Sequence, residues 1–137
     1  MKILFVCKAN VGRSQMAQAF FNNYSKDHSS ISAGTQVGEH EGEKIGENPK
    51  ALYVWEVMDE EGIDVRDYRR SQLNENMLRD ADKVVVITNP ESWPDYLKNS
   101  SKLEYWDIDD AKGTDYNFHV KSRDEVKIRV QKLLESI

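Results

Sequence analysis

Cysteine is almost absent from this sequence, because Cys7 is the only one among 137 residues. A single cysteine excludes an intrachain disulfide and a metal site built from several cysteines, so nothing calls for an oxidising compartment. No apolar run approaches the ~20 residues that a membrane-spanning helix needs. The run Ile3–Val6 is too short for a signal-peptide core and has no small-residue cleavage site after it. These features predict a cytoplasmic protein.

The sequence also has no excess of basic over acidic residues. Lysine and arginine number 19 against 24 acidic residues, which gives a formal net charge of −5. Nucleic-acid binders carry a basic surface, so we expect no nucleic-acid partner, and the missing apolar run predicts no membrane partner. An anionic ligand would need a local attractive site, because the overall field repels it. The length predicts one globular domain over residues 1–137.

The pattern of apolar residues predicts strands that alternate with helices. Four runs have the length of strands and cover residues 2–6, 30–33, 83–87 and 103–108. Helical spacing begins near Ser14, Pro49 and Ser122, and weaker helical patterns cover residues 75–79 and 90–97. Residues 34–48 and 109–115 have the composition of loops. The alternation predicts an α/β fold with a parallel sheet.

The single cysteine stands at the end of the first expected strand, in the segment VCKANVGRSQ. Ligands of open parallel sheets bind at the carboxyl ends of the strands. Residues 8–12 contain turn-forming asparagine and glycine, and a helix is expected to begin directly after them. Amides of such a loop and of a helix N-terminus bind anions and favour a thiolate. The position of Cys7 therefore suits an anion-binding nucleophile.

Arg13 and Ser14 complete this constellation. A guanidinium matches two oxygens of a phosphate-like group, and the Ser14 hydroxyl is placed to donate a hydrogen bond to sulfur. Attack on a phosphate ester would form a thiophosphate on Cys7, while Arg13 and the amides stabilise the transition state. A lone cysteine at a strand end is more often a small buried apolar residue. The preceding strand, the loop and the Arg-Ser start of a helix favour the nucleophile here.

The segment VCKANVGRSQMAQA resembles the signature loop of the low molecular weight protein tyrosine phosphatases, a family that includes arsenate reductases of the same fold. Further segments resemble family elements in the same order along the chain: ISAGT, EEGIDVRDYRRSQL, ADKVVVIT and YWDIDDAKGTD. The resemblance implies a three-layer α/β sandwich with a four-stranded parallel sheet in the order 2-1-3-4, flanked by helices. It implies no metal ion and no organic cofactor.

The resemblance also implies roles for matching positions. Cys7 is the expected nucleophile, and Arg13 is the expected phosphate-binding side chain. Asn10 matches an asparagine that holds the loop in a left-handed conformation. Ser14 matches a hydroxyl that donates to the thiolate, and Ser32 matches a serine that supports the asparagine. The expected substrate-binding residues are Lys8, Ala9, Asn10, Val11, Gly12 and Ser14.

The general acid is expected in the segment after the fourth strand. A phosphate ester needs a proton on its leaving oxygen, so a carboxylic acid must reach that atom. The segment offers four aspartates, Asp107, Asp109, Asp110 and Asp115. The residues alone do not choose among them. The resemblance favours Asp110, although Ala111 stands where the family usually has proline.

Several positions depart from the family pattern. Gly12 stands where many members have a second cysteine, and Tyr68 stands where they have a supporting histidine. The aromatic pair that usually follows the acid is missing. The three histidines are scattered along the chain, at positions 28, 40 and 119, so we expect them at the surface and expect no metal site.

Three functions are compatible with these residues. The favoured one is a cysteine-dependent phosphomonoesterase, a protein tyrosine phosphatase that acts on a phosphorylated protein or a small aryl phosphate. The second is an arsenate reductase, which would need an external small thiol because Cys7 has no partner cysteine. The third is a non-catalytic phosphate-binding module, although binding alone needs neither a thiol nor an acid. We expect a monomer or a weak dimer.

Overall fold

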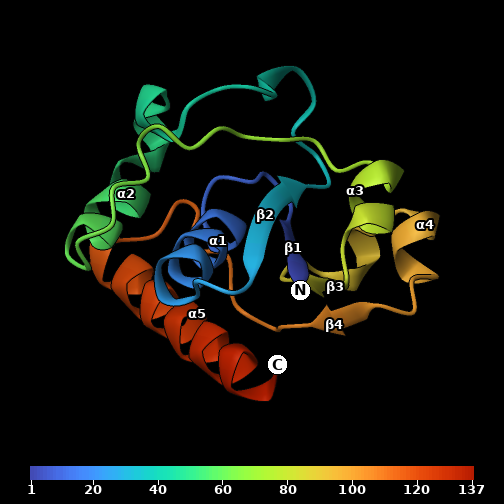
Figure 1. The fold of residues 1–137 in the computed structure, drawn as a ribbon. Coiled ribbons are helices and arrows are strands. Elements are labelled where there is room, and N and C mark those ends of the chain that lie inside the picture. The colour runs from blue at the N-terminus through green and yellow to red at the C-terminus, as the bar shows by residue number, and fades with distance from the viewer.

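The computed structural model describes every residue from Met1 to Ile137 and shows a parallel sheet with helices on both faces (Figure 1). The sheet consists of β1 (Lys2–Cys7), β2 (Ser29–Gly34), β3 (Lys83–Val86) and β4 (Leu103–Tyr105). All pairings are parallel, and the strand order is β2-β1-β3-β4. The α/β fold and the order 2-1-3-4 are thus confirmed. The carboxyl ends of β1, β3 and β4 meet at one edge of the sheet, where Cys7 lies.

Three helices cover one face of the sheet: α1 (Arg13–Tyr24), α2 (Leu52–Asp59) and α5 (Tyr116–Ser136) (Figure 1). Alternate strand residues, among them Ile3 and Phe5, point into this layer and pack against Phe20, Phe21 and Val126. These five side chains are fully buried. At about 1.5–3 kcal/mol for each large apolar side chain, this cluster is the main source of stability.

Two shorter helices, α3 (Glu75–Asp80) and α4 (Asp95–Lys98), cover the opposite face (Figure 1). Leu4 and Val6 of β1 point to this side and pack in a smaller cluster with Leu78 and Leu97. Both faces of β1 are therefore buried, which explains why its sequence is a continuous apolar run. Four 3₁₀ turns complete the chain: Gly38–His40, Ile45–Glu47, Pro49–Ala51 and Pro90–Ser92. None of the helices combines the length and apolar character needed to cross a membrane.

Several expected boundaries were wrong. The last helix begins at Tyr116 rather than at Ser122, because the Asp115 carboxylate accepts a hydrogen bond from Phe118 N at 2.9 Å and caps it. The fourth strand ends at Tyr105 rather than at 108, after three residues of pairing with β3. The weak helix expected over 90–97 is a 3₁₀ turn and a separate α4, because Pro94 interrupts the pattern.

One histidine differs from expectation. His119 was expected at the surface but is 8% exposed, with its ring 5.3 Å from that of Tyr53. Its Nδ1 lies 2.9 Å from the carbonyl oxygen of Asp115. Because α5 begins six residues earlier than the apolar pattern indicated, His119 falls in the first turns of the helix and packs against α2.

Candidate active site

Three carbonyl groups of residues 8–12, called here the 8–12 loop, accept hydrogen bonds from donors outside the loop. The Lys8 carbonyl accepts from Gln36 N at 2.8 Å, and the Ala9 carbonyl accepts from Arg70 Nε at 3.1 Å. The Asn10 carbonyl accepts from Gln15 Nε2 at 3.1 Å. In a trans peptide the N–H points opposite to the C=O, and no peptide of the chain is cis. The amides of Ala9, Asn10 and Val11, which belong to the same three peptides, therefore point away from these donors.

Asn10 N is the amide that reaches a protein acceptor, the Cys7 sulfur, at 3.3 Å. The amides of Ala9, Val11 and Gly12 have no acceptor within the protein. Directly after them comes the N-terminus of α1, whose first N–H groups also lack acceptors in the helix. Unbonded amides of a loop that leads into a helix N-terminus bind anions and stabilise a thiolate.

The end of β2 supports the loop from outside and requires glycine. A Cβ atom at Gly34 would lie 2.6 Å from the Lys8 carbonyl oxygen and 2.9 Å from Asn10 N. Real Cβ atoms do not come so close to backbone, so the 8–12 loop packs here against bare main chain. The segment ISAGT therefore supports the site in two ways: Gly34 lets the loop pack closely, and Ser32 accepts a hydrogen bond from Asn10.

Cys7 and Ser14 form the centre of a buried hydrogen-bond network. Cys7 is 2% exposed, and its sulfur lies 2.9 Å from Ser14 Oγ. Asn10 Nδ2 donates to Ser14 Oγ at 2.8 Å and to Ser32 Oγ at 3.0 Å. Because the Ser14 oxygen already accepts a hydrogen bond from Asn10, its own proton is free to point at the sulfur. The structure thus brings together the four residues that the resemblance had linked.

Asn10 has φ = 56° and is the only residue other than glycine with positive φ. This is the left-handed conformation expected at this position, which asparagine tolerates better than most residues. Its Oδ1 accepts from Ser71 N at 2.7 Å and from Gln15 Nε2 at 3.1 Å. A backbone N–H can only donate, so the atom that faces Ser71 N must be the Asn10 oxygen. The NH₂ group of Asn10 therefore faces Ser14.

Arg13 is held in place by two carbonyl groups in the segments that follow β3 and β4. Its Nη1 donates to the carbonyl oxygens of Ile87, at 2.6 Å, and Ile108, at 3.0 Å. Its Nη2 lies 3.6 Å from Asp110 Oδ2, an ion pair too long for a hydrogen bond. The side chain is 11% exposed. One edge of the guanidinium, with Nε and Nη2, therefore remains to bind two oxygens of a ligand.

The structure separates the four candidate aspartates. Asp115 caps α5, and Asp109 lines a small cavity beside α5 with Phe118 and Ser122. Asp107 lies 3.5 Å from the Tyr105 hydroxyl. Asp110 alone pairs with Arg13, and its side chain is 53% exposed. The Asp110 side chain also accepts a hydrogen bond from Lys112 N at 2.9 Å, which shapes the turn without proline at position 111.

The same order of elements and the same loop occur in known proteins. The model of the low molecular weight phosphotyrosine protein phosphatases matches residues 2–137. The chain belongs to this family. Membership supports a phosphatase, in agreement with the thiol, amides and arginine assembled at the carboxyl end of β1.

Individual members with similar sequence or structure carry different names. An arsenate reductase of Staphylococcus epidermidis is 31% identical over 130 residues, which cover 94% of this chain and 92% of the relative. A low molecular weight protein tyrosine phosphatase from T. tengcongensis is 30% identical, with a TM-score of 0.84 and coverage of 100% and 99%. The YwlE arginine phosphatase from Geobacillus stearothermophilus is 26% identical, with a TM-score of 0.79 and coverage of 98% and 91%.

Two positions depart from the family pattern in instructive ways. A Cβ at Gly12 would meet only Val54, at 3.9 Å. The backbone at this position therefore has room for a side chain, although this protein has glycine there. Tyr68, where the resemblance implies a supporting histidine, packs against the large core and makes no side-chain hydrogen bond. Burial, together with the charge of Asp64, raises the pKa of the Tyr68 hydroxyl.

Three residues that the sequence did not single out support the loop instead. Gln15 and Arg70 are 1% and 7% exposed and donate to carbonyls of the loop, while Ser71 donates its amide to Asn10. In the sequence, nothing distinguishes Arg70 from its neighbour Arg69, which is exposed. Only the path of residues 69–73 past the loop reveals the difference.

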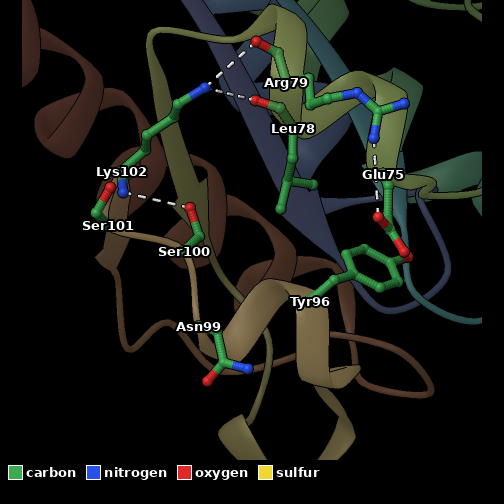
Figure 2. Close-up of a pocket in the computed structure, with 8 residues that line it drawn as sticks. All are labelled: Glu75, Leu78, Arg79, Tyr96, Asn99, Ser100, Ser101 and Lys102. Carbon is green, nitrogen blue, oxygen red and sulfur yellow. Dashed lines mark hydrogen bonds and ion pairs between the residues drawn. The ribbon is translucent and has the colours of Figure 1, made fainter.

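A larger cavity than the one beside α5 lies away from Cys7. It has a volume of about 290 Å³ and lies between α3 and the segment from Tyr96 to Lys102 (Figure 2). Lys102 directly precedes β4, so this cavity borders the amino end of the strand, opposite to Cys7. Lys102 Nζ donates to the carbonyls of Leu78 and Arg79, and Arg79 pairs with Glu75. Its cations are committed to protein groups, so we assign it no role in the site.

Proposed function

We propose that this chain is a cysteine-dependent phosphomonoesterase that acts on aryl phosphates, with phosphotyrosine in a protein as the natural class of substrate. The observation that carries the proposal is the Cys7 sulfur, contacted by the Asn10 amide and Ser14 Oγ in a loop whose other amides have no protein acceptor, directly before Arg13 with its unbonded Nε and Nη2. Together they match a tetrahedral dianion placed for attack by sulfur.

In the first step, the Cys7 sulfur attacks phosphorus. An S–P bond forms while the P–O bond to the leaving group breaks, and the leaving oxygen takes a proton from Asp110. Arg13 Nε and Nη2 and the amides of the 8–12 loop hold the remaining oxygens as charge develops. Asp110 pairs with Arg13 at the entrance, so one movement of an exposed side chain brings it to the leaving oxygen.

In the second step, a water molecule attacks phosphorus and transfers a proton to Asp110. The S–P bond breaks, inorganic phosphate is released, and the electron pair returns to the Cys7 sulfur. The Ser14 hydroxyl, 2.9 Å from that sulfur, stabilises the thiolate as it leaves. The same hydrogen bond favours the thiolate before the first attack. Ser14 therefore serves both halves of the reaction.

The aryl preference is supported by two aromatic rings beside the Arg13 end of the site. Trp93 donates its Nε1–H to Thr88 O, just after Ile87, and its ring meets that of Tyr105 at 5.6 Å. Tyr105 is 40% exposed. Desolvation and Asp107 raise the pKa of its hydroxyl while Arg13 opposes them, so the ring remains neutral. The two rings meet edge to face at 71°, so the exposed Tyr105 ring offers an apolar face against which an aromatic leaving group can pack.

Arsenate reduction is the second candidate, favoured by the arsenate reductase among the relatives. Arsenate would replace phosphate, and attack by Cys7 would form an S–As bond with loss of water. An external thiol would then attack the Cys7 sulfur, and the electron pair of the S–As bond would reduce arsenic and release arsenite. The resulting mixed disulfide needs a second external thiol, because the chain has no other cysteine.

The deciding experiment is hydrolysis of a small aryl phosphate under reducing conditions, with wild type beside Cys7→Ser. We expect turnover by wild type, none by the variant, and phosphate binding in both. A loss of no more than about tenfold in the variant would rule out Cys7 as the nucleophile. Phosphoarginine and arsenate with a small thiol are assayed in parallel. Activity on one of these alone would replace the aryl phosphate, and phosphate binding without any turnover would indicate a binding module.

A further inference from the structure

Arg70 is a buried arginine that contacts the 8–12 loop from outside the site. Its Nε donates to the Ala9 carbonyl at 3.1 Å, and its Nη1 donates to Glu43 Oε1 at 3.1 Å. Arg70 is 7% exposed and the Glu43 side chain 29%. The main chain is held as well, because Arg70 N donates to the Glu43 carbonyl at 2.9 Å. The guanidinium therefore has little freedom to leave Ala9.

The Ala9 carbonyl and the Asn10 amide belong to one peptide group. The peptide is trans, so its C=O and N–H point in opposite directions. The carbonyl points at Arg70, and the N–H points at the Cys7 sulfur at 3.3 Å. A charge-assisted bond to the carbonyl also polarises the peptide and strengthens its N–H as a donor. Arg70 thus acts on the sulfur through this peptide without touching it.

We propose that Arg70, held by Glu43, is a positioning residue that aims the Asn10 amide at the Cys7 thiolate and at the bound oxyanion. The neighbouring peptides of the loop are held by the Gln36 amide and the Gln15 side chain, which are neutral donors. Among the three donors to the carbonyls of Lys8, Ala9 and Asn10, Arg70 is the charged one. The proposal deepens the proposed function and rests on it for the identity of the reaction, but the state of the thiol can be measured without turnover.

The test compares Arg70→Met with Arg123→Met, a matched control. Arg123 is 8% exposed and donates to the Val57 carbonyl at 2.9 Å and to Glu60 at 3.0 Å, so it makes the same kinds of bonds between α2 and α5. The first readout is the ultraviolet absorbance of the thiolate against pH, with Cys7→Ser as the background. The second is the affinity for inorganic phosphate, measured by calorimetry.

For Arg70→Met we expect the pH at which the thiolate appears to rise by about one unit, and phosphate to bind about tenfold more weakly. Arg123→Met should reduce thermal stability and leave both readouts unchanged. If Arg70→Met titrates and binds phosphate like wild type, or if Arg123→Met shifts both readouts as far, the proposal is wrong.

Glu43→Gln provides a second test that does not depend on the folding of Arg70→Met. It keeps the shape of the partner but removes its charge, so we expect the same directions with roughly threefold effects. If Arg70→Met does not fold, and Glu43→Gln titrates and binds phosphate like wild type, the proposal is wrong. Absence of aryl phosphate hydrolysis by wild type would refute the proposed function instead, and the titration would still decide the role of Arg70.

Discussion

Replacement of Asn10 by glycine tests the network behind the nucleophile. Asn10 is fully buried, and its side chain makes four hydrogen bonds, two to hydroxyls and two from N–H donors. Glycine adopts the observed φ of 56° without strain, so Asn10→Gly removes the network and keeps the backbone conformation. The loss can therefore be assigned to the side chain.

The expected loss of stability follows from those four bonds. At roughly 1 kcal/mol each, their removal lowers the free energy of unfolding by about 3–4 kcal/mol. That is a large part of the ~5–15 kcal/mol typical of a domain, so the variant should fold but melt early. Asn10→Ala should lose about 1–2 kcal/mol more, because alanine in the left-handed region is strained. Without Asn10, the Ser14 hydroxyl loses its orientation, and kcat/KM should fall on the order of 10²-fold.

The assay combines denaturant unfolding with hydrolysis of an aryl phosphate. Asn22→Ala is the control, because the Asn22 side chain also makes three hydrogen bonds, all to Ser30 near the amino end of the sheet. It should lose some stability and no activity. Equal stability of Asn10→Gly and Asn10→Ala would refute the strain argument. Unchanged kcat/KM in Asn10→Gly would refute the view that this network orients Ser14.

Three further predictions concern other parts of the structure. Asp110→Asn should slow hydrolysis of esters with poor leaving groups far more than of those with good ones, and equal effects in a leaving-group series would exclude it as the acid. Gly34→Ala should weaken phosphate binding in calorimetry, because its Cβ would lie 2.6 Å from a carbonyl of the 8–12 loop; wild-type affinity would contradict this. Burial raises the pKa of Glu104, but hydrogen bonds, from Lys83 above all, lower it below its ordinary value. Glu104→Gln should therefore have a lower melting temperature than wild type at neutral pH. In acid, where both side chains are neutral, the two melting temperatures should be equal; a difference that stays constant across pH would disprove the contribution of the ion pair.

Much of the fold could be predicted because the pattern of apolar residues records burial directly. The run from Ile3 to Val6 is apolar on both faces, as expected for the central strand of a covered parallel sheet. The start of α5 was missed because its first turn, residues 116–119, mixes Phe118 with tyrosine, asparagine and histidine and does not continue the apolar spacing that begins at Val126. The cap that begins the helix is Asp115, one aspartate among four in that segment.

The sequence by itself determined the local part of the site. A strand, a loop and a helix that are contiguous in the chain place Cys7, Asn10, Arg13 and Ser14 together, because short loops leave few alternatives. Tertiary structure alone decided which aspartate faces Arg13 and which arginine is buried behind the loop. Asp110 is ninety-seven positions beyond Arg13 and Arg70 sixty-one beyond Ala9, so their contacts depend on how β3, β4 and the segment 69–73 pack, which no local pattern records.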